Sequence, residues 1–202
     1  MADAVGSGFR ENETLKRYVD LLADVGVSWG LLGPNEGAAE RLWQRHIFNS
    51  LALEPLLAPG ARVVDVGSGA GLPGIPLASV RSDVDMTLLD SLQRRFDFLT
   101  MAVERLELGE RVHVVRERAE EHRGQYEAVV CRAVAPLERL VRWCCGLLGE
   151  SGVLLALKGE SAVGELRLAG SELAKRRLRA EVRQLAAPEG ERTWVVVVSK
   201  GR

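Results

Sequence analysis

The sequence predicts an α/β fold with a mostly parallel sheet of seven strands, in which the last strand runs antiparallel. After Gly60, short apolar runs that end in Gly, Asp or Arg alternate with segments of helical periodicity, a pattern typical of parallel sheets. The last two runs are joined by residues 188–191, a connection too short for a crossover helix, so they must form an antiparallel hairpin. A glycine-rich turn after the first run opens a helix, which is a further mark of this fold class.

Length and composition fit one domain. The chain has 202 residues, of which 47% are apolar and 27% charged, enough for a sizeable core and incompatible with disorder as the main state. We expect a single domain over residues 1–202, with an N-terminal helical extension at 11–58 and a Rossmann-like core at 61–202.

Two helical stretches are predicted in the extension. Apolar residues recur three and four apart from Leu15 to Val25, which predicts a helix that begins at Glu13 and ends at Gly26. A second stretch begins near residues 34–36 and continues to Leu57, where Pro59 and Gly60 end it.

The core then supplies the strands and one clear helix. Apolar residues from Leu92 to Leu106 keep helical spacing behind Asp90 and Ser91, each a possible N-cap. The predicted strands are RVVDVG (62–67), VDMTLLD (84–90), RVHVVR (111–116), YEAVVCR (126–132), GVLLALK (152–158), EVRQLAA (181–187) and TWVVVVSK (193–200).

Several classes of function are disfavoured. No apolar run approaches the roughly 18 residues of a membrane span, and no leader is visible at the N-terminus, so we expect a cytoplasmic protein that needs no membrane. Cys131, Cys144 and Cys145 lack metal-ligand spacing, so we expect reduced thiols and no metal site. The net charge of −1 gives no global basic field, although residues 151–202 hold ten Lys and Arg against six Asp and Glu.

The glycine-rich turn, VVDVGSGAGLPGIPLA at residues 63–78, has two interpretations. Residues 69–74 fit the GxGxxG of dinucleotide sites, but two residues separate this motif from the strand and Pro73 removes an amide that a pyrophosphate would use. The register Asp65-x-Gly67-x-Gly69-x-Gly71 instead resembles the S-adenosylmethionine loop of class I methyltransferases. We favour this second interpretation, which makes Asp65, Gly67, Ser68, Gly69 and Gly71 candidate cofactor-binding residues.

Two carboxylates near this turn each allow a structural alternative. Asp90 ends the second strand, where α/β sheets present an acid to ribose hydroxyls, but it is also a candidate helix N-cap. Asp65 is either part of the cofactor site or a charge that fixes the loop through backbone amides.

Three cations are predicted at the same edge of the sheet. Arg132, Lys158 and Arg192 follow or precede strands whose ends meet there, and cations without a nucleophile suggest phosphate binding. The alternative is that each is a solvated residue at a strand end. The basic run at 175–179, with Arg167 and Arg183, is predicted on a helix and suits nucleic acid or solvent equally.

Beyond these features, the chain resembles the RsmG family, also called GidB, whose members methylate N7 of a guanine in bacterial 16S ribosomal RNA. The resemblance covers most of the chain and rests on LWQRHIFNSL (42–51), VVDVGSGAGLPGIPLA (63–78), LLDSLQRRFDFL (88–99), ERAEE (117–121), VVCRAVAPLERLVRWC (129–144), LALKGE (155–160) and GERTWVVVVSK (190–200). The ordered set is specific, whereas the glycine loop alone is shared by many methyltransferases.

The resemblance implies roles for individual residues. Gly67 and Leu72 would contact S-adenosylmethionine, with Ala119 and Glu120 beside its adenine. Arg132 would lie at the boundary of cofactor and substrate, and Lys158 and Arg192 are the implied RNA contacts. Asn49 stands where the family commonly has Asp, and His46 is either a core histidine or part of the site mouth.

The implied partner is 16S ribosomal RNA within the small ribosomal subunit or an assembly intermediate. Methylation of a ring nitrogen with an in-plane lone pair needs no general base, so the residues named would position the substrate and the cofactor. Two alternatives remain at this stage: a methyltransferase for small molecules, with an enclosed apolar acceptor pocket, and a nucleotide-binding module without chemistry.

Overall fold

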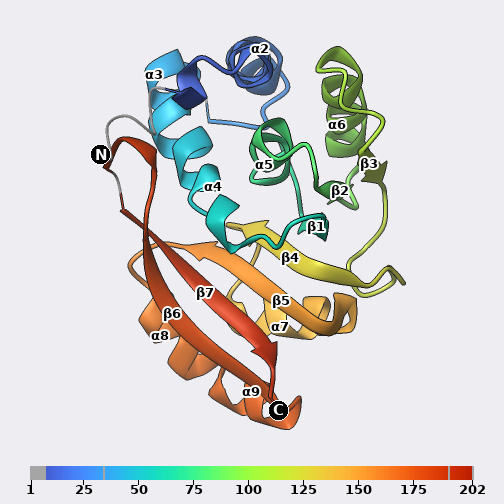
Figure 1. Ribbon diagram of the computed structural model, residues 1–202, viewed down its shortest axis with the longest axis vertical. Coiled ribbons are helices and arrows are strands. Elements are labelled where there is room, and N and C mark those ends of the chain that lie inside the picture. Colours follow the sequence, from blue (N-terminus) through green and yellow to red (C-terminus); the bar gives the residue numbers. More distant parts are fainter. Residues whose placement is uncertain (1–7, 34, 191, 202) are drawn as a thin grey trace.

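A computed structural model describes residues 8–33, 35–190 and 192–201 (Figure 1). Its seven-stranded sheet has the order β3-β2-β1-β4-β5-β7-β6. The pairs among β1 to β5 are parallel, and β7 is antiparallel to both of its neighbours. The strands are β1 Arg62–Val66, β2 Asp85–Leu89, β3 Val112–Val115, β4 Tyr126–Arg132, β5 Leu148–Lys158, β6 Leu178–Ala186 and β7 Arg192–Lys200. The predicted sheet, including its closing hairpin, is confirmed.

Two strands begin earlier than their apolar runs predicted. β5 begins at Leu148, which pairs with Tyr126 beyond an irregularity in the register of β4. β6 begins at Leu178 because β7 extends to Lys200 and supplies a partner along the whole length. Backbone pairing with a longer neighbour thus overrides the weak local pattern.

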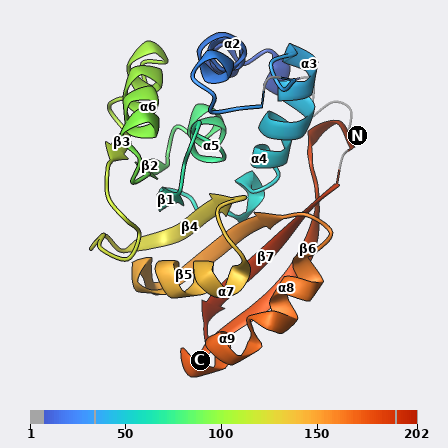
Figure 2. The same cartoon turned by 180° about the vertical axis from the view of Figure 1, so that it is seen from behind.

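Helices cover both faces of the sheet (Figures 1 and 2). The N-terminal helices pack with α5 (Gly74–Val80) and α6 (Gln93–Arg105) on one apolar core, which contains Val63, Met86 and Leu155. On the opposite face, a second core contains Val64, Val129 and Cys131, and includes residues of the three remaining helices. These are α7 Leu137–Cys144, α8 Ala162–Leu168 and α9 Gly170–Lys175.

The extension differs from its prediction in where the second helical stretch begins. α2 (Glu13–Leu21) continues as a π-helical segment, Leu22–Gly26, and so ends where expected. The second stretch begins at Ala39 rather than near residues 34–36, and Pro34 lies outside the described residues. It consists of α3 Ala39–Leu42, a π-helical segment Trp43–Phe48 and α4 Asn49–Leu51, and it therefore ends before the expected Leu57, with a separate 3₁₀ turn at Glu54–Leu56. Before this stretch, the amide of Glu36 donates a hydrogen bond to the carbonyl of Gly33 at 2.9 Å.

Two further predictions are wrong. The basic run at 175–179 is not helical: α9 ends at Lys175, Arg177 has a positive φ of 54°, and Arg179 lies on β6. Helix α6 has Leu92 as its N-cap, rather than Asp90 or Ser91. The three cysteines are free thiols, as expected. Among the helices described, none has the length and apolar character needed to cross a membrane.

Candidate active site

The loop after β1 requires glycine at two positions. Gly67 and Gly71 have φ values of +68° and +94°, which side chains other than glycine rarely adopt. A Cβ on Gly67 would lie 2.9 Å from the side chain of Val134, and one on Gly71 would lie 2.4 Å from that of Ile75. The loop backbone therefore lies directly against these neighbours, with no room for a side chain at either position.

Asp65 supports this loop from beneath. Its buried carboxylate accepts hydrogen bonds through Oδ2 from the Ser68 hydroxyl at 2.6 Å and the Gly74 amide at 2.9 Å. Burial raises the pKa of Asp65 to about 7, and Oδ1 has no partner in the described part of the chain. Asp65 thus supports the loop from inside and lines neither of the two cavities described below, whereas Ser68 both bonds to Asp65 and lines the second of them.

Tyr18 is a second residue that supports the glycine loop, and it was not predicted from the sequence. Its buried hydroxyl donates to the carbonyl of Ala70 at 2.6 Å and so fixes the loop to α2. In the sequence, Tyr18 belongs to the apolar face of an amphipathic helix, and nothing in that pattern distinguishes it from a core residue.

Asp90 lies beside the loop at the end of β2. Its Oδ2 accepts from the Gly69 amide and its Oδ1 from the Leu92 amide, both at 3.0 Å, while Arg95 lies 3.3 Å away. The carboxylate is almost fully buried, and it therefore ties the glycine loop to the start of α6.

A crevice of about 160 Å³ runs along this carboxylate. Gly67, Asp90, Ala119 and Glu120, all predicted from the sequence, line it together with Trp143. An adenosine group has a flat base and a ribose with hydroxyl donors. The apolar wall of the crevice suits the base, its carboxylates can accept from the hydroxyls, and Gly67 lets the group approach the loop backbone closely. The residues present therefore fit the predicted cofactor.

A second cavity, of about 260 Å³, lies on the other side of Gly67 and Val134, which line both spaces. Leu72 and Arg132 border it, and the extension contributes Leu31 and Leu32. The loop is thus bordered on one side by core elements and on the other by the N-terminal extension.

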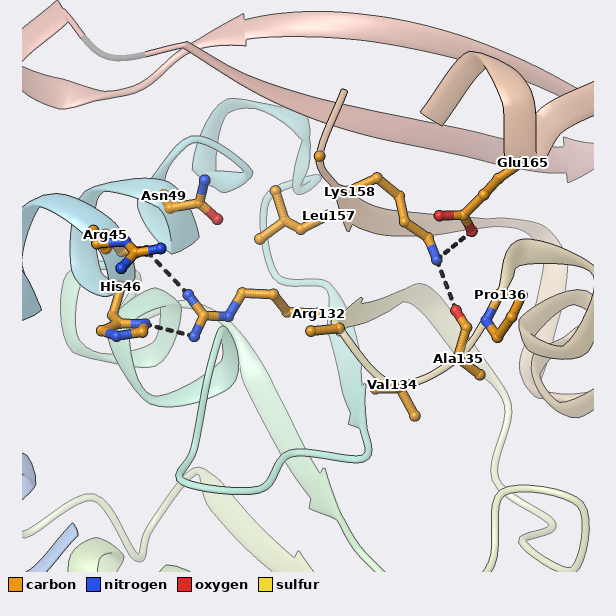
Figure 3. Close-up of a pocket in the computed structure, with 12 residues that line it drawn as sticks. Arg45, His46, Asn49, Arg132, Val134, Ala135, Pro136, Leu157, Lys158 and Glu165 are labelled. Carbon is orange, nitrogen blue, oxygen red and sulfur yellow. Dashed lines mark hydrogen bonds and ion pairs between the residues drawn. The ribbon is translucent and has the colours of Figure 1, made fainter. Parts of the chain in front are cut away.

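A pocket of about 520 Å³, called the wide pocket below, adjoins this region and shares Arg132 and Val134 with the second cavity. Figure 3 shows Arg132 and Lys158 on opposite sides of the pocket, with their charged ends pointing apart. The residues that line it are Arg45, His46, Asn49, Arg132, Ala133, Val134, Ala135, Pro136, Leu157, Lys158, Gly159 and Glu165.

The two predicted cations that line this pocket, Arg132 and Lys158, have internal partners. Arg132 donates to the carbonyl of Arg45 at 3.1 Å and to Nδ1 of His46 at 2.6 Å. Lys158 donates to the Ala135 carbonyl and to Glu165 Oε2, both at 2.7 Å, and its side chain is 7% exposed. Glu165 therefore compensates the charge of Lys158 within the protein.

Arg192 differs from the other two predicted cations. It is exposed at the start of β7, donates to Gln184 at 3.2 Å and does not line the wide pocket. The strand order brings all three residues to one edge of the sheet, but the pocket itself contains Arg132 and Lys158 without Arg192.

The sheet order and the glycine loop after β1 define the class I fold of S-adenosylmethionine-dependent methyltransferases. Two solved structures share it. P. horikoshii TYW2 in complex with MeSAdo has a TM-score of 0.62 at 13% identity over 78% of this chain and 64% of that one. The B. subtilis tRNA methyltransferase TrmK has a TM-score of 0.60 at 18% identity over 76% and 65%.

The family of rRNA small subunit methyltransferase G matches residues 11–192, and the chain belongs to this family. A relative of that name from Thermobifida fusca is 52% identical over 80% of this chain and 68% of its own length. Another, from Mycolicibacterium smegmatis, is 49% identical over 76% and 66%. The chain is thus a methyltransferase with S-adenosylmethionine as its cofactor, which excludes a binding module without chemistry.

Proposed function

We propose that this protein transfers a methyl group from S-adenosylmethionine to N7 of a guanine in 16S ribosomal RNA. We further propose that it acts in the cytoplasm, on the small ribosomal subunit or an assembly intermediate. The observation that carries the proposal is the arrangement of cavities: the space beside the glycine loop adjoins a wide pocket that contains Arg132 and Lys158. The names of the relatives, which specify small-subunit rRNA, support this substrate class.

The chemistry of the wide pocket suits an acceptor that needs no base. S-adenosylmethionine supplies a methyl group on a positively charged sulfur. Guanine N7 already has an in-plane lone pair, so the protein has to align donor and acceptor rather than remove a proton. Glu165 is held by Lys158, and both ring nitrogens of His46 are engaged by Glu36 and Arg132, so neither group is free to remove a proton.

Each residue near the loop then has a proposed role. Gly67, Gly69 and Leu72 would hold the donor through close backbone approach, and Asp90 would accept from ribose hydroxyls at the rim of the crevice. Ala119 and Glu120 would border the adenine. Asp65, Ser68 and Gly71 would act indirectly, because they fix the shape of the loop.

The predicted cations would organise the pocket or contact RNA phosphates, and none would lie directly beside the reacting N7. As the methyl group arrives, positive charge moves onto the guanine, so a free cation directly beside N7 would raise the barrier. Arg132 and Lys158 both have internal partners, which suits organisation of the pocket, whereas the exposed Arg192 is available for a phosphate. A small-molecule acceptor would favour an enclosed apolar pocket, but the lining here includes Arg45, Arg132 and Lys158.

A methyl-transfer assay on defined RNA substrates tests the proposal. S-adenosylmethionine with a labelled methyl group is incubated with small subunits lacking the modification, with naked 16S rRNA and with guanosine, and the modified base is then mapped. We expect label on one guanine N7, with subunits as the best substrate. Label at another base or atom, or faster methylation of guanosine than of RNA, would contradict the proposal.

A further inference from the structure

Two side chains of the N-terminal extension and one at the end of β4 form a continuous hydrogen-bonded series at the edge of the wide pocket. Glu36, in the loop before α3, lies 3.0 Å from Nε2 of His46, and Nδ1 of His46 lies 2.6 Å from the guanidinium of Arg132. Figure 3 shows the last of these contacts, which joins the extension to the end of β4. The His46 side chain is 12% exposed and that of Glu36 is 22% exposed.

The chemistry of the two outer residues determines the protonation state of the middle one. A guanidinium has donors and no acceptor, so Nδ1 of His46 must be the acceptor and carry no proton. The proton of the neutral ring is therefore on Nε2, where it donates to the Glu36 carboxylate. A doubly protonated ring would place an N–H group and a positive charge against Arg132.

We infer that Glu36 and neutral His46 are positioning residues that hold Arg132 in its working orientation, and that protonation of His46 releases it. Arg132 is the residue to hold, because it lines both the wide pocket and the cavity beside the glycine loop. The inference rests on the proposed function only for the consequence that methyl transfer depends on this orientation.

The charged groups around His46 shift its pKa in opposite directions. Burial and the positive charge of Arg132 lower the pKa of His46, and Glu36 partly opposes this. The net pKa of His46 is below its usual value, so the ring is neutral at physiological pH. The charged groups that face His46 or its partner Glu36 are Arg41, Arg45 and Arg132, and Lys158 and Glu165 lie across the pocket.

Nuclear magnetic resonance of the free protein tests the hydrogen-bonded series without any substrate. The chain has three histidines, so the ring nitrogens of His46 can be assigned from a His46→Asn variant. We expect a proton on Nε2 and none on Nδ1 at neutral pH, and side-chain resonances of Arg132 that shift with the titration of His46. A proton on Nδ1 at neutral pH, or Arg132 resonances that ignore this titration, would overturn the inference.

The pH profile of methyl transfer tests the consequence. With S-adenosylmethionine and unmodified small subunits, we expect kcat/KM of the wild type to fall by about tenfold per pH unit below the pKa of His46. His46→Asn retains an acceptor at the δ position and cannot titrate, so its profile should lose this acid limb, whereas His46→Leu should be impaired at every pH. His113→Asn is the matched control, since His113 is half exposed on β3 beside Asp85.

Two outcomes separate this inference from the proposed function. An acid limb that persists in His46→Asn, in a variant whose thermal unfolding shows it to be folded, overturns the positioning role. If the wild type methylates no RNA, the proposed function fails, whereas coupled titration of His46 and Arg132 in the free protein would still support the positioning role.

Discussion

The crevice along Asp90 and the wide pocket are neighbours, but they are built in different ways. One side of the crevice is the loop after β1, which can lie directly against Val134 because Gly67 has no Cβ. The wide pocket is formed by side chains whose positions depend on hydrogen bonds between distant elements, such as Arg132 with His46 and Lys158 with Glu165. The crevice is therefore sensitive to added volume, and the pocket to the loss of a partner.

The largest loss of stability is expected from Gly71→Ala. The new Cβ would lie 2.4 Å from Ile75 and 3.1 Å from the Tyr18 hydroxyl, at a φ of +94°. Strain and overlap together should cost about 2–4 kcal/mol of unfolding free energy and distort the cofactor loop. Urea unfolding and calorimetry with S-adenosylmethionine measure both effects. Gly109→Ala, where nothing lies within 4 Å of the added Cβ, is the control. Equal cofactor affinity in the two variants would show that the loop accommodates a side chain at position 71.

Asp65→Asn should change how stability depends on pH. The folded-state pKa of about 7 exceeds the ordinary 3.8, so Asp65 stabilises the fold fully below pH 3.8 and loses this contribution as pH rises to 7. Asn accepts the same two hydrogen bonds but cannot ionise. Relative to wild type, the variant should therefore gain about 3–4 kcal/mol between pH 4 and pH 8, as measured by urea unfolding. Parallel stability curves for the two proteins would contradict the raised pKa.

Lys158→Met tests the side-chain pocket by removing one partner. The variant leaves Glu165 and the Ala135 carbonyl without their donor, which should cost about 1–3 kcal/mol of unfolding free energy. Adding Glu165→Gln should recover part of the loss, since the amide oxygen still accepts from the Leu137 backbone at the start of α7. A double variant no more stable than Lys158→Met alone would mean that the pair is not coupled.

The smallest effect is expected from Arg192→Ala. This exposed residue donates to Gln184 and supports no other element, so stability should change by less than about 0.5 kcal/mol. Loss of a phosphate contact should weaken binding to small subunits by about threefold to tenfold and reduce its salt dependence by about one unit, with cofactor affinity retained. Arg179→Ala, at the far end of the same hairpin, is the matched control. Loss of cofactor binding alone in Arg192→Ala would contradict the assignment.

Prediction from the sequence was most successful where the signal is local. Asp65 lies near the end of β1, the glycine loop follows this strand directly, and Asp90 follows β2. Because β1 and β2 are parallel, their carboxyl ends meet at one edge of the sheet. Lys158 and Arg192 show what could not be predicted from the sequence, namely the partners of each side chain. Both were predicted at that edge from strand ends, but the sequence could not show that Glu165 holds one of them while the other stays exposed.

The sequence by itself determined the sheet, its closing hairpin and the glycine-rich loop after β1, because periodicity and glycine placement act over a few residues. The tertiary structure alone decided that Tyr18 fixes the loop and that Glu36 and His46 hold Arg132. It also decided that the basic run after α9 forms a turn and a strand instead of a helix. These outcomes depend on which groups meet after the chain has folded, and a hydrogen bond between residues 86 positions apart leaves no pattern in the sequence between them.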